Sequence, residues 1–540
     1  MRTILALTVG RFGLVLLCGV LLASVTVPSL AQPATSAPTA PRPATDARPR
    51  VAVIGFEPDP AGDARDTWIP VALEELLARR LQRVPNLVIV PTLRLYQARS
   101  ELGDPNAPPP WPDIVRGLGA GYILSGRCQG PDNAITLELT LQPLAEGAAG
   151  WQTTIPAARL FEMLDLATRW TLERFELTLD DATRTVVLAT PSRTPTAVEY
   201  YARALMATRA DQSRDALRFA TLALDRDKRF RPALALLAQL EMPLGPSGRG
   251  SAGRRFRALS DLARLENDPF DRVRAEIGQA LLLQADDASD AAYTRAETAL
   301  ALAYEYRDVY GQMAAVTAIC DAYLLRALPI NGTSSEADRE THTRTCVQRA
   351  IEWQILLVDL LTELGDQIAC LPATNKLALL YERVGDTARA LELHRRTLAL
   401  AEQLQSRRHQ ATAWLYIGEW HRVQKQWPEA LAAITRCLAL ADEAAKPPVR
   451  IILGGVYQGM GQREEALAQF ELAYEQVRKT DDLGSQFACL RQIASAHMQL
   501  GRRDKAIAAL QEAIDIAHVL ELREEQDLRT ELHKWQDGGT

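Results

Sequence analysis

The sequence predicts a mainly α-helical fold, an α-solenoid of antiparallel helix pairs, preceded by a small α+β domain. Two observations lead to this expectation. Between Leu371 and Ala517 one pattern of small and large side chains occurs four times, whereas residues 50–180 combine short apolar segments typical of strands with amphipathic segments typical of helices. A third observation, an apolar N-terminal segment followed by a Pro/Ala/Thr-rich one, predicts that the protein is exported.

Residues 1–31 have the features of a secretory signal peptide. Arg2 and Arg11 precede an apolar run over residues 12–27. Ser-Leu-Ala at residues 29–31 forms a small-x-small cleavage site. The run is shorter than the about 20 residues that a membrane span needs. We therefore expect cleavage, and an uncleaved N-terminal anchor, which would keep the protein near the membrane, is the alternative.

Residues 32–49 are rich in Pro, Ala and Thr and are predicted to be a disordered linker, because they offer little to bury. Loss of the signal peptide would leave 59 of the 61 basic residues against 67 acidic ones, a net charge of −8. The chain carries no basic block that would neutralise phosphate groups. Charge therefore argues against nucleic acid as the partner.

Residues 50–180 are predicted to form an α+β domain. The expected elements, in chain order, are a strand at 51–56, a helix at 67–83, a strand at 87–90, helices at 92–102 and 113–118, strands at 122–128, 134–142 and 151–155, and a closing helix at 160–177. Apolar residues alternate with polar ones over 134–142, so one face of that strand should be buried. The acidic segment 57–66 matches no calcium loop and is interpreted as a solvated loop.

This part resembles the amino-terminal domain of the TolB translocation protein and its relatives (the FlgO/TolB amino-terminal type). The resemblance rests on the strand 51–56, Trp68 followed by Leu-Glu-Glu-Leu at 73–76, Pro-Asn-Leu-Val at 85–88 and Gly-Tyr-Ile-Leu-Ser-Gly at 121–126. In that family the domain makes contacts in the bacterial cell envelope and has no known active site. The resemblance therefore implies a binding module in the periplasm or cell envelope of a bacterium.

The repeat pattern occupies four blocks that begin at Leu371, Ala411, Pro447 and Phe487. Positions 8, 11, 20, 24 and 27 of the blocks are Ala378, Tyr381, Ala390, His394 and Thr397; Gly418, His421, Ala430, Ile434 and Cys437; Gly454, Tyr457, Ala466, Phe470 and Ala473; and Ala494, His497, Ala506, Leu510 and Ala513. A small residue facing an alanine lets two helices approach closely, while larger residues fill the space beside them. Gly385, Gly461 and Gly501 fall between the paired helices, where a positive φ ends a helix without steric cost.

The blocks resemble tetratricopeptide repeats (TPRs), whose signature places a Trp, a small residue and a Tyr on the first helix and an Ala-aromatic-Ala series on the second. The block with Trp414, Gly418 and Ala430 is similar to this signature. Block spacings of 40, 36 and 40 residues exceed the TPR period of about 34, which predicts longer helices or turns. Junction prolines are expected only at Pro372 and at Pro447-Pro448.

The remaining helical chain extends the array on both sides. Residues 196–355 are predicted to form degenerate TPR-like helical hairpins, because Ala204, Ala216, Ala220 and Ala223 repeat the pattern more weakly. The four TPRs are assigned to residues 360–521. Residues 522–540 are rich in Glu and Arg and are predicted to be a polar capping helix.

No segment of the sequence carries a recognisable catalytic, cofactor-binding or metal-binding motif, so we expect no enzyme, no cofactor and no metal. Residues 248–253 have the letters of a dinucleotide fingerprint but follow a helix, and they are interpreted as an inter-repeat loop, with an anion site as the alternative. Residues 117–121 (Gly-Leu-Gly-Ala-Gly) are interpreted as a turn. The six cysteines after the signal are expected to be buried thiols, with Cys320–Cys346 or Cys346–Cys370 as alternative disulfides.

In TPRs the first helices line a concave groove, which the resemblance places at positions 2, 5, 9, 12 and 13 of each block. The predicted partner-binding residues are Asn375, Leu379, Arg383, Leu415, Glu419, Arg422, Ile451, Gln458, Arg491, Ser495 and Met498. This mixture of apolar, amide and arginine side chains suits a peptide or a partner helix with apolar anchors and a carboxylate. An ordinary solvated face is the alternative.

The sequence thus predicts an exported, non-enzymatic TPR scaffold that mediates protein–protein interactions in the bacterial cell envelope, as an adaptor in assembly, secretion or signalling. The alternative is a sensory or small-ligand-binding protein, in which the TolB-N-like domain binds a metabolite or envelope polymer and the repeats relay the signal. The identity of the protein or peptide partner does not follow from the residues.

Overall fold

The structure is a computed structural model that describes residues 47–58, 67–102, 110–129, 135–157, 159–189, 192, 194–328 and 336–537. The predicted signal peptide, most of the predicted linker and residues 59–66 of the predicted acidic loop lie outside these residues, whereas Glu57, at the start of that segment, belongs to the first strand. The chain divides into two compact units, the first ending at Val384 and the second beginning at Gly385. None of the described helices combines the length and the apolar composition of a membrane span.

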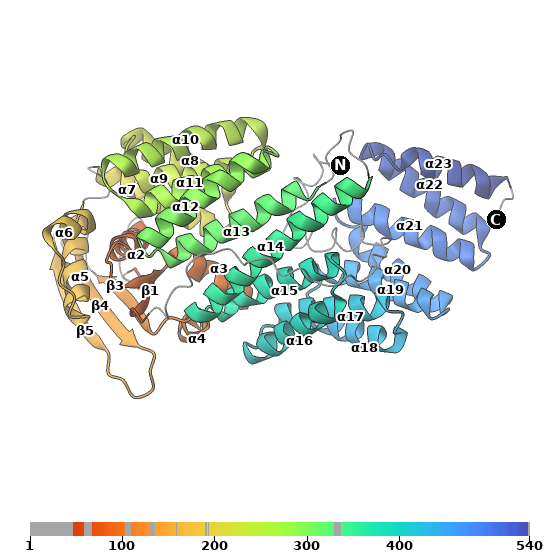
Figure 1. The fold of residues 1–540 in the computed structure, drawn as a ribbon, viewed down its shortest axis with the longest axis horizontal. Helices are drawn as coiled ribbons and strands as arrows, with labels where there is room; N and C mark the ends of the chain where they lie inside the picture. Colours follow the sequence, from red (N-terminus) through yellow and green to blue (C-terminus); the bar gives the residue numbers. More distant parts are fainter. Residues whose placement is uncertain are drawn as a thin grey trace. The chain divides into compact units, whose positions relative to one another are not determined.

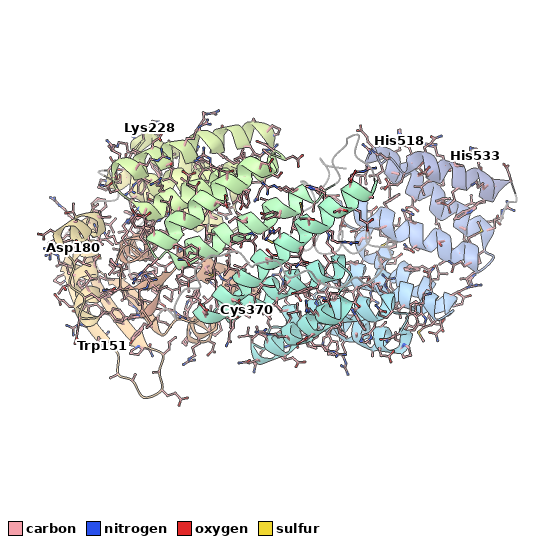
Figure 2. All side chains as sticks on the ribbon, in the orientation of Figure 1. Trp151, Asp180, Lys228, Cys370, His518 and His533 are labelled. Carbon is pink, nitrogen blue, oxygen red and sulfur yellow. The ribbon has the colours of Figure 1, made fainter. Side chains whose placement is uncertain are left out.

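The first unit begins with one mixed sheet (Figure 1). Its strands are β1 (Arg50–Glu57), β2 (Val88–Val90), β3 (Tyr122–Gln129), β4 (Ile135–Pro143) and β5 (Trp151–Ala157). The strand order is β2-β1-β3-β4-β5, parallel over the first three strands and antiparallel over the last three. Trp151, labelled in Figure 2, lies at the start of the last strand. The predicted order of strands and helices is confirmed, and the hairpin segment that joins β3 to β4 lies outside the described residues.

In the first unit, helices α2, α3 and α4 lie between the strands in the sequence, and the other helices follow the last strand. The helices are α2 (Trp68–Leu81), α3 (Thr92–Leu102), α4 (Trp111–Gly117), α5 (Leu160–Arg174), α6 (Asp181–Val187), α7 (Pro195–Arg209), α8 (Ser213–Arg226), α9 (Arg231–Glu241), α10 (Gly245–Leu265), α11 (Pro269–Ala285), α12 (Ser289–Glu305), α13 (Val309–Arg326), α14 (Glu336–Leu364) and α15 (Gln367–Arg383). From α7 onward each helix packs on the next, as a solenoid requires.

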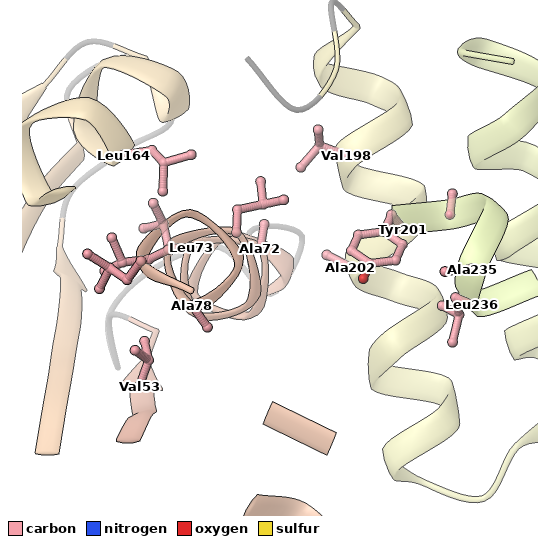
Figure 3. Packing of buried hydrophobic residues seen from close by; sticks show 14 of the residues in the cluster. Val53, Ala72, Leu73, Ala78, Leu164, Val198, Tyr201, Ala202, Ala235 and Leu236 are labelled. Atoms are coloured by element: carbon pink, nitrogen blue, oxygen red, sulfur yellow. The ribbon is translucent and has the colours of Figure 1, made fainter. Parts of the chain in front are cut away.

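Helix α2 is buried on nearly every side, because it lies between the sheet and the first helices of the array. Figure 3 shows it with Leu164 of α5 on one side and Val198 and Tyr201 of α7 on the other. A single hydrophobic cluster runs from Val51 of β1 to Leu282 of α11. The α+β part and the first helical hairpins therefore share one core.

The second unit begins with α16, the second helix of the first predicted repeat, and continues with helix pairs in the predicted register. Its helices are α16 (Thr387–Gln403), α17 (Arg407–Val423), α18 (Trp427–Leu440), α19 (Lys446–Gly459), α20 (Arg463–Val477), α21 (Leu483–Gln499), α22 (Arg503–Val519) and α23 (Glu525–Gln536). Several helices have 17 residues, which accounts for the long repeat spacing. The described part of the predicted capping helix is α23, which buries Leu528 and Leu532 against the preceding pair.

The small positions of the repeats allow the close helix contacts that the sequence predicts. A Cβ atom added to Gly418 would lie 2.4 Å from Cδ1 of Ile434, and one added to Gly454 would lie 2.3 Å from Cε1 of Phe470. Ile434 and Phe470 are fully buried. Each large side chain thus occupies the space that the glycine opposite leaves empty.

The turns within the pairs contain a residue in the left-handed region, as predicted for the glycines. Gly385, Gly461 and Gly501 have φ values of +84°, +79° and +71°, and Lys425 takes the equivalent place with +58°. After three of these residues the next amide donates a hydrogen bond of 2.9 Å to the carbonyl five residues earlier. This geometry ends one helix and directs the chain into the next.

Two local expectations are wrong. Residues 248–253 are not a loop but part of α10, and Gly248 is needed there because its Cβ would lie 2.3 Å from the carbonyl oxygen of Glu241. Pro372 does not mark a junction between helices. It lies inside α15, in the second turn of the helix, where proline removes one intrahelical hydrogen bond.

Candidate partner-binding face

The predicted binding residues lie on the first helices of the pairs. Leu415, Glu419 and Arg422 are on α17, Ile451 and Gln458 on α19, and Arg491, Ser495 and Met498 on α21. Because α17 packs on α19 and α19 packs on α21, their outward residues form one continuous surface of the second unit. We call this surface, at block positions 2, 5, 9, 12 and 13, the first-helix face. Asn375, Leu379 and Arg383 lie on α15 and thus belong to the first unit.

Two of the predicted residues are buried and offer no surface to a partner. Asn375 is 6% exposed and Leu415 is 9% exposed. Leu415 belongs to a hydrophobic cluster with Val449 and Leu453 of α19. A large apolar residue at position 5, such as Leu415, therefore packs against the first helix of the next pair.

The other predicted residues remain accessible to different extents. Leu379, Glu419, Arg422, Ile451, Gln458, Ser495 and Met498 are half-buried, whereas Arg383 and Arg491 are exposed. Arg422 is engaged within its own helix, because its Nε and Nη2 atoms donate to the two carboxylate oxygens of Glu419, at 2.9 Å each. Arg491 forms no ion pair with any described residue and lies over the ring of Phe487, 5.8 Å from its centroid.

Gly455 opens the centre of the first-helix face. A Cβ atom added there would meet nothing within 4 Å. Since glycine weakens a helix interior by about 0.5–1 kcal/mol relative to alanine, Gly455→Ala is expected to raise the free energy of unfolding by about that amount. Urea denaturation of the full chain measures the gain. The adjacent Gly454→Ala should lose stability instead, because its Cβ would overlap Phe470, and equal effects of the two changes would contradict this assignment.

Comparison with protein families bears directly on these helix pairs. The family described as Tetratricopeptide repeat matches residues 367–443 and 449–517. Residues 367–517 of this chain are tetratricopeptide repeats. No curated protein matches the sequence.

Several solved structures with TPR-like folds are similar to the chain. One is a STAND (signal transduction ATPase with numerous domains) protein with a tetratricopeptide repeat sensor from Pyrococcus horikoshii, with 12% identity, a TM-score of 0.47 and coverage of 69% of this chain and 57% of that one. A second is the apo form of RapI, with 13% identity, a TM-score of 0.41 and coverage of 63% of this chain and 96% of that one. A third is the apo form of the quorum sensor NprR from B. thuringiensis, with 11% identity, a TM-score of 0.37 and coverage of 63% of this chain and 98% of that one. This chain spans little more than half the length of the STAND protein.

The register of the matched repeats, applied to α7, selects residues that the sequence analysis did not assign to the binding face. With Ala204 at position 8, positions 2, 5 and 13 of the first hairpin are Val198, Tyr201 and Arg209, all on α7. These positions correspond to the first-helix face, and the chain's own helix α2 lies on them (Figure 3). The alanine spacing could have identified the three residues, but nothing in the sequence indicates which segment covers them.

The contact between α7 and α2 is polar as well as apolar. The hydroxyl of Tyr201 donates to Glu75 at 3.1 Å. Nη2 of Arg209 donates to Glu74 at 2.9 Å, and the guanidinium of Arg209 lies 3.8 Å from the ring centroid of Tyr96. The first hairpin thus holds a helix by an apolar contact and by hydrogen bonds to two buried carboxylates.

The folded protein shifts the pKa values of the two carboxylates in opposite directions. Burial opposes ionisation of Glu75, but Arg79 and the hydroxyl of Thr92 outweigh it and lower its pKa to about 2. Burial raises the pKa of Glu74, and Arg209 only partly offsets this effect. The different outcomes follow from Arg79, which is hydrogen-bonded to Glu75 at 2.6 Å.

Within the described ranges, no three His, Cys, Asp or Glu side chains are placed to hold a metal ion. The cysteines of the described chain are all buried and unbridged, including Cys370 on α15 (Figure 2), and burial raises the pKa of Cys437 to about 12, which makes this thiol unreactive. A hollow of about 380 Å³ in the second unit contains none of the predicted binding residues; it is lined by Glu443, Arg450, Leu472, Glu475, Gln476 and Lys479.

Proposed function

We propose that this protein is an exported, non-enzymatic TPR scaffold of the bacterial cell envelope, whose C-terminal repeats hold a helix or peptide of a partner protein. TPR repeats are consistent with a protein-interaction scaffold. Export and the envelope location rest on residues 1–31 and on the TolB-like sequence features of residues 50–180.

One observation carries the binding proposal. In the first hairpin, the first-helix positions hold a helix, which happens to be α2 of the same chain. The C-terminal repeats repeat this register with α17, α19 and α21. We therefore expect the surface formed by α17, α19 and α21 to take an external helix in the way that α7 takes α2.

The chemistry of the C-terminal first-helix face defines what such a partner offers. Met498 supplies an apolar contact, Gln458 and Ser495 supply hydrogen-bonding groups, and Gly455 leaves room for a bulky side chain. Arg491 forms no ion pair with a described carboxylate and lies over the ring of Phe487. A partner helix with an apolar residue and a carboxylate on the same face suits this set.

The test is capture of partners from envelope extracts by the full chain and by variants of the face. Gly455→Tyr fills the open centre of the face, and Arg491→Glu reverses its free charge. Both are expected to lower recovery of a dominant partner at least about tenfold, because each removes or opposes a central contact. The matched control is Leu472→Tyr, at a position that is 46% exposed on the second helix α20. Recovery that survives both face variants, or that falls equally in the control, would refute the proposal.

A second candidate function has support of its own. The α+β part and the first hairpins share one hydrophobic core, so a metabolite or envelope polymer bound to the α+β part would act directly on the repeats. In this sensory reading, ligand addition would raise the midpoint of thermal unfolding of the full chain. An unchanged midpoint across metabolite and glycan fragments would argue against it.

A further inference from the structure

Three successive turns between helix pairs in the first unit are contacted by the N-terminal part of the chain. The turns precede α11, α13 and α15, and each contains a residue in the left-handed region followed by an N-cap aspartate. The N-cap residues are Asp268, Asp308 and Asp366, and each accepts a hydrogen bond from a backbone amide of the helix that it begins. The turns are therefore equivalent points of the array.

Arginines from separate elements reach these turns. Arg83, just after α2, donates from Nε and Nη2 to Oδ2 of Asp268 at 2.8 and 2.5 Å. Arg48, before β1, donates to the carbonyl of Arg307 at 2.9 Å. These bonds span 185 and 259 residues of sequence, so they fix the α+β part to distant repeats.

The third turn, before α15, is contacted by two arginines of the α+β part. Arg94 of α3 donates from Nε and Nη2 to the two oxygens of Asp366 at 3.2 and 3.1 Å. Arg50 of β1 donates to the carbonyls of Glu363 and Leu364. Asp366 has a side chain that is only 1% exposed, so this ion pair is shielded from water and salt.

Backbone contact reinforces the third turn. Gly119 has a φ of +71°, and a Cβ atom there would lie 2.1 Å from the carbonyl oxygen of Leu364 and 2.8 Å from the carbonyl carbon of Gly365. The two backbones meet where any side chain would separate them. Gly119 belongs to the segment 117–121, which the sequence alone indicates only as a turn.

We infer that the α+β domain holds three repeat turns at a fixed spacing and thereby regulates the position of α15. Helix α15 begins at the third turn and carries the predicted binding residues Asn375, Leu379 and Arg383. A ligand or partner that shifts the α+β domain would move this first helix of the matched TPRs. The regulatory role rests on the proposed binding function, whereas the fixed spacing of the turns does not.

Hydrogen–deuterium exchange of the full chain, without any partner, tests whether the α+β domain holds the repeat turns in place. Gly119→Ala forces the two backbones apart, and Arg94→Gln removes the ion pair with Asp366 while keeping a polar side chain. Both changes are expected to speed exchange at residues 364–370 at least about tenfold, because local opening there would no longer break the contacts with the α+β domain. Exchange in α17–α22 should stay unchanged.

Matched controls separate this effect from general strain. Gly147→Ala places alanine at a similar φ of +75°, but nothing lies within 4 Å of its Cβ. Arg116→Gln removes an exposed ion pair with Asp113 in the same domain. If Gly119→Ala does not fold, Arg94→Gln carries the test. Unchanged exchange at the third turn, or equally faster exchange throughout the first unit, would overturn the inference. Loss of partner capture with normal exchange would instead count against the proposed function alone.

Discussion

Replacement of Phe470 by alanine is expected to lower the free energy of unfolding of the second unit by about 3–5 kcal/mol, the range for removal of a buried aromatic ring. The ring is fully buried and lies against Gly454, where even a Cβ atom would come within 2.3 Å of it. Since glycine has no side chain that could move into the vacated space, the cavity should persist. Urea denaturation followed by far-ultraviolet circular dichroism measures the loss.

The control for this change lies two residues away on the same helix. Leu472 is 46% exposed, so Leu472→Ala should change the free energy of unfolding by no more than about 0.5 kcal/mol. Similar losses for the two variants would show that ring burial against glycine does not stabilise the repeats. The comparison thus tests the packing rule on which the repeat assignment depends.

Glu75→Gln is expected to destabilise the first unit at neutral pH by on the order of 3 kcal/mol, and the loss should shrink as the pH falls. The folded protein holds the pKa of Glu75 at about 2, below the ordinary 4.5. A carboxylate with a depressed folded-state pKa stabilises fully above the unfolded value and loses this contribution as the pH falls through the folded value. The stabilities of the two proteins should therefore converge between about pH 4.5 and pH 2.

Denaturation at a series of pH values measures this convergence. Glu74 has a raised pKa and produces the opposite trend, but it is present in both proteins and cancels in their difference. Glu57→Gln is the control, because its ion pair with Arg127 is exposed and should contribute less than about 1 kcal/mol. A difference between wild type and Glu75→Gln that stays constant with pH would contradict the assignment.

Local signals in the sequence predicted the order of the elements and the packing of the repeats. Alternating apolar residues predicted β4, and the glycines at 461 and 501 predicted turns that the structure confirms with positive φ. These features depend on residues that are close in sequence, whose spacing reflects the geometry of a helix or strand.

The docking of the α+β part on the array could not be predicted in this way. Arg94 and Asp366 lie 272 residues apart, and neither carries a local signal that names the other. For the same reason the burial of Leu415 was missed, because the register places it on the first-helix face without showing how closely α19 approaches. Residues 248–253 were misread because four small residues in sequence resemble a loop, whereas close contact with Glu241 favours glycine inside a helix.

The core that runs unbroken from Val51 to Leu282 limits how this protein can be divided or recombined. A gene fusion or truncation with its junction near residue 185 would leave α2 without its cover and expose the fully buried rings of Tyr201 and Phe230. Such pieces should be insoluble when expressed alone and should recover solubility when co-expressed. In any engineered fusion, the α+β part and its first hairpins should therefore be moved together as one segment.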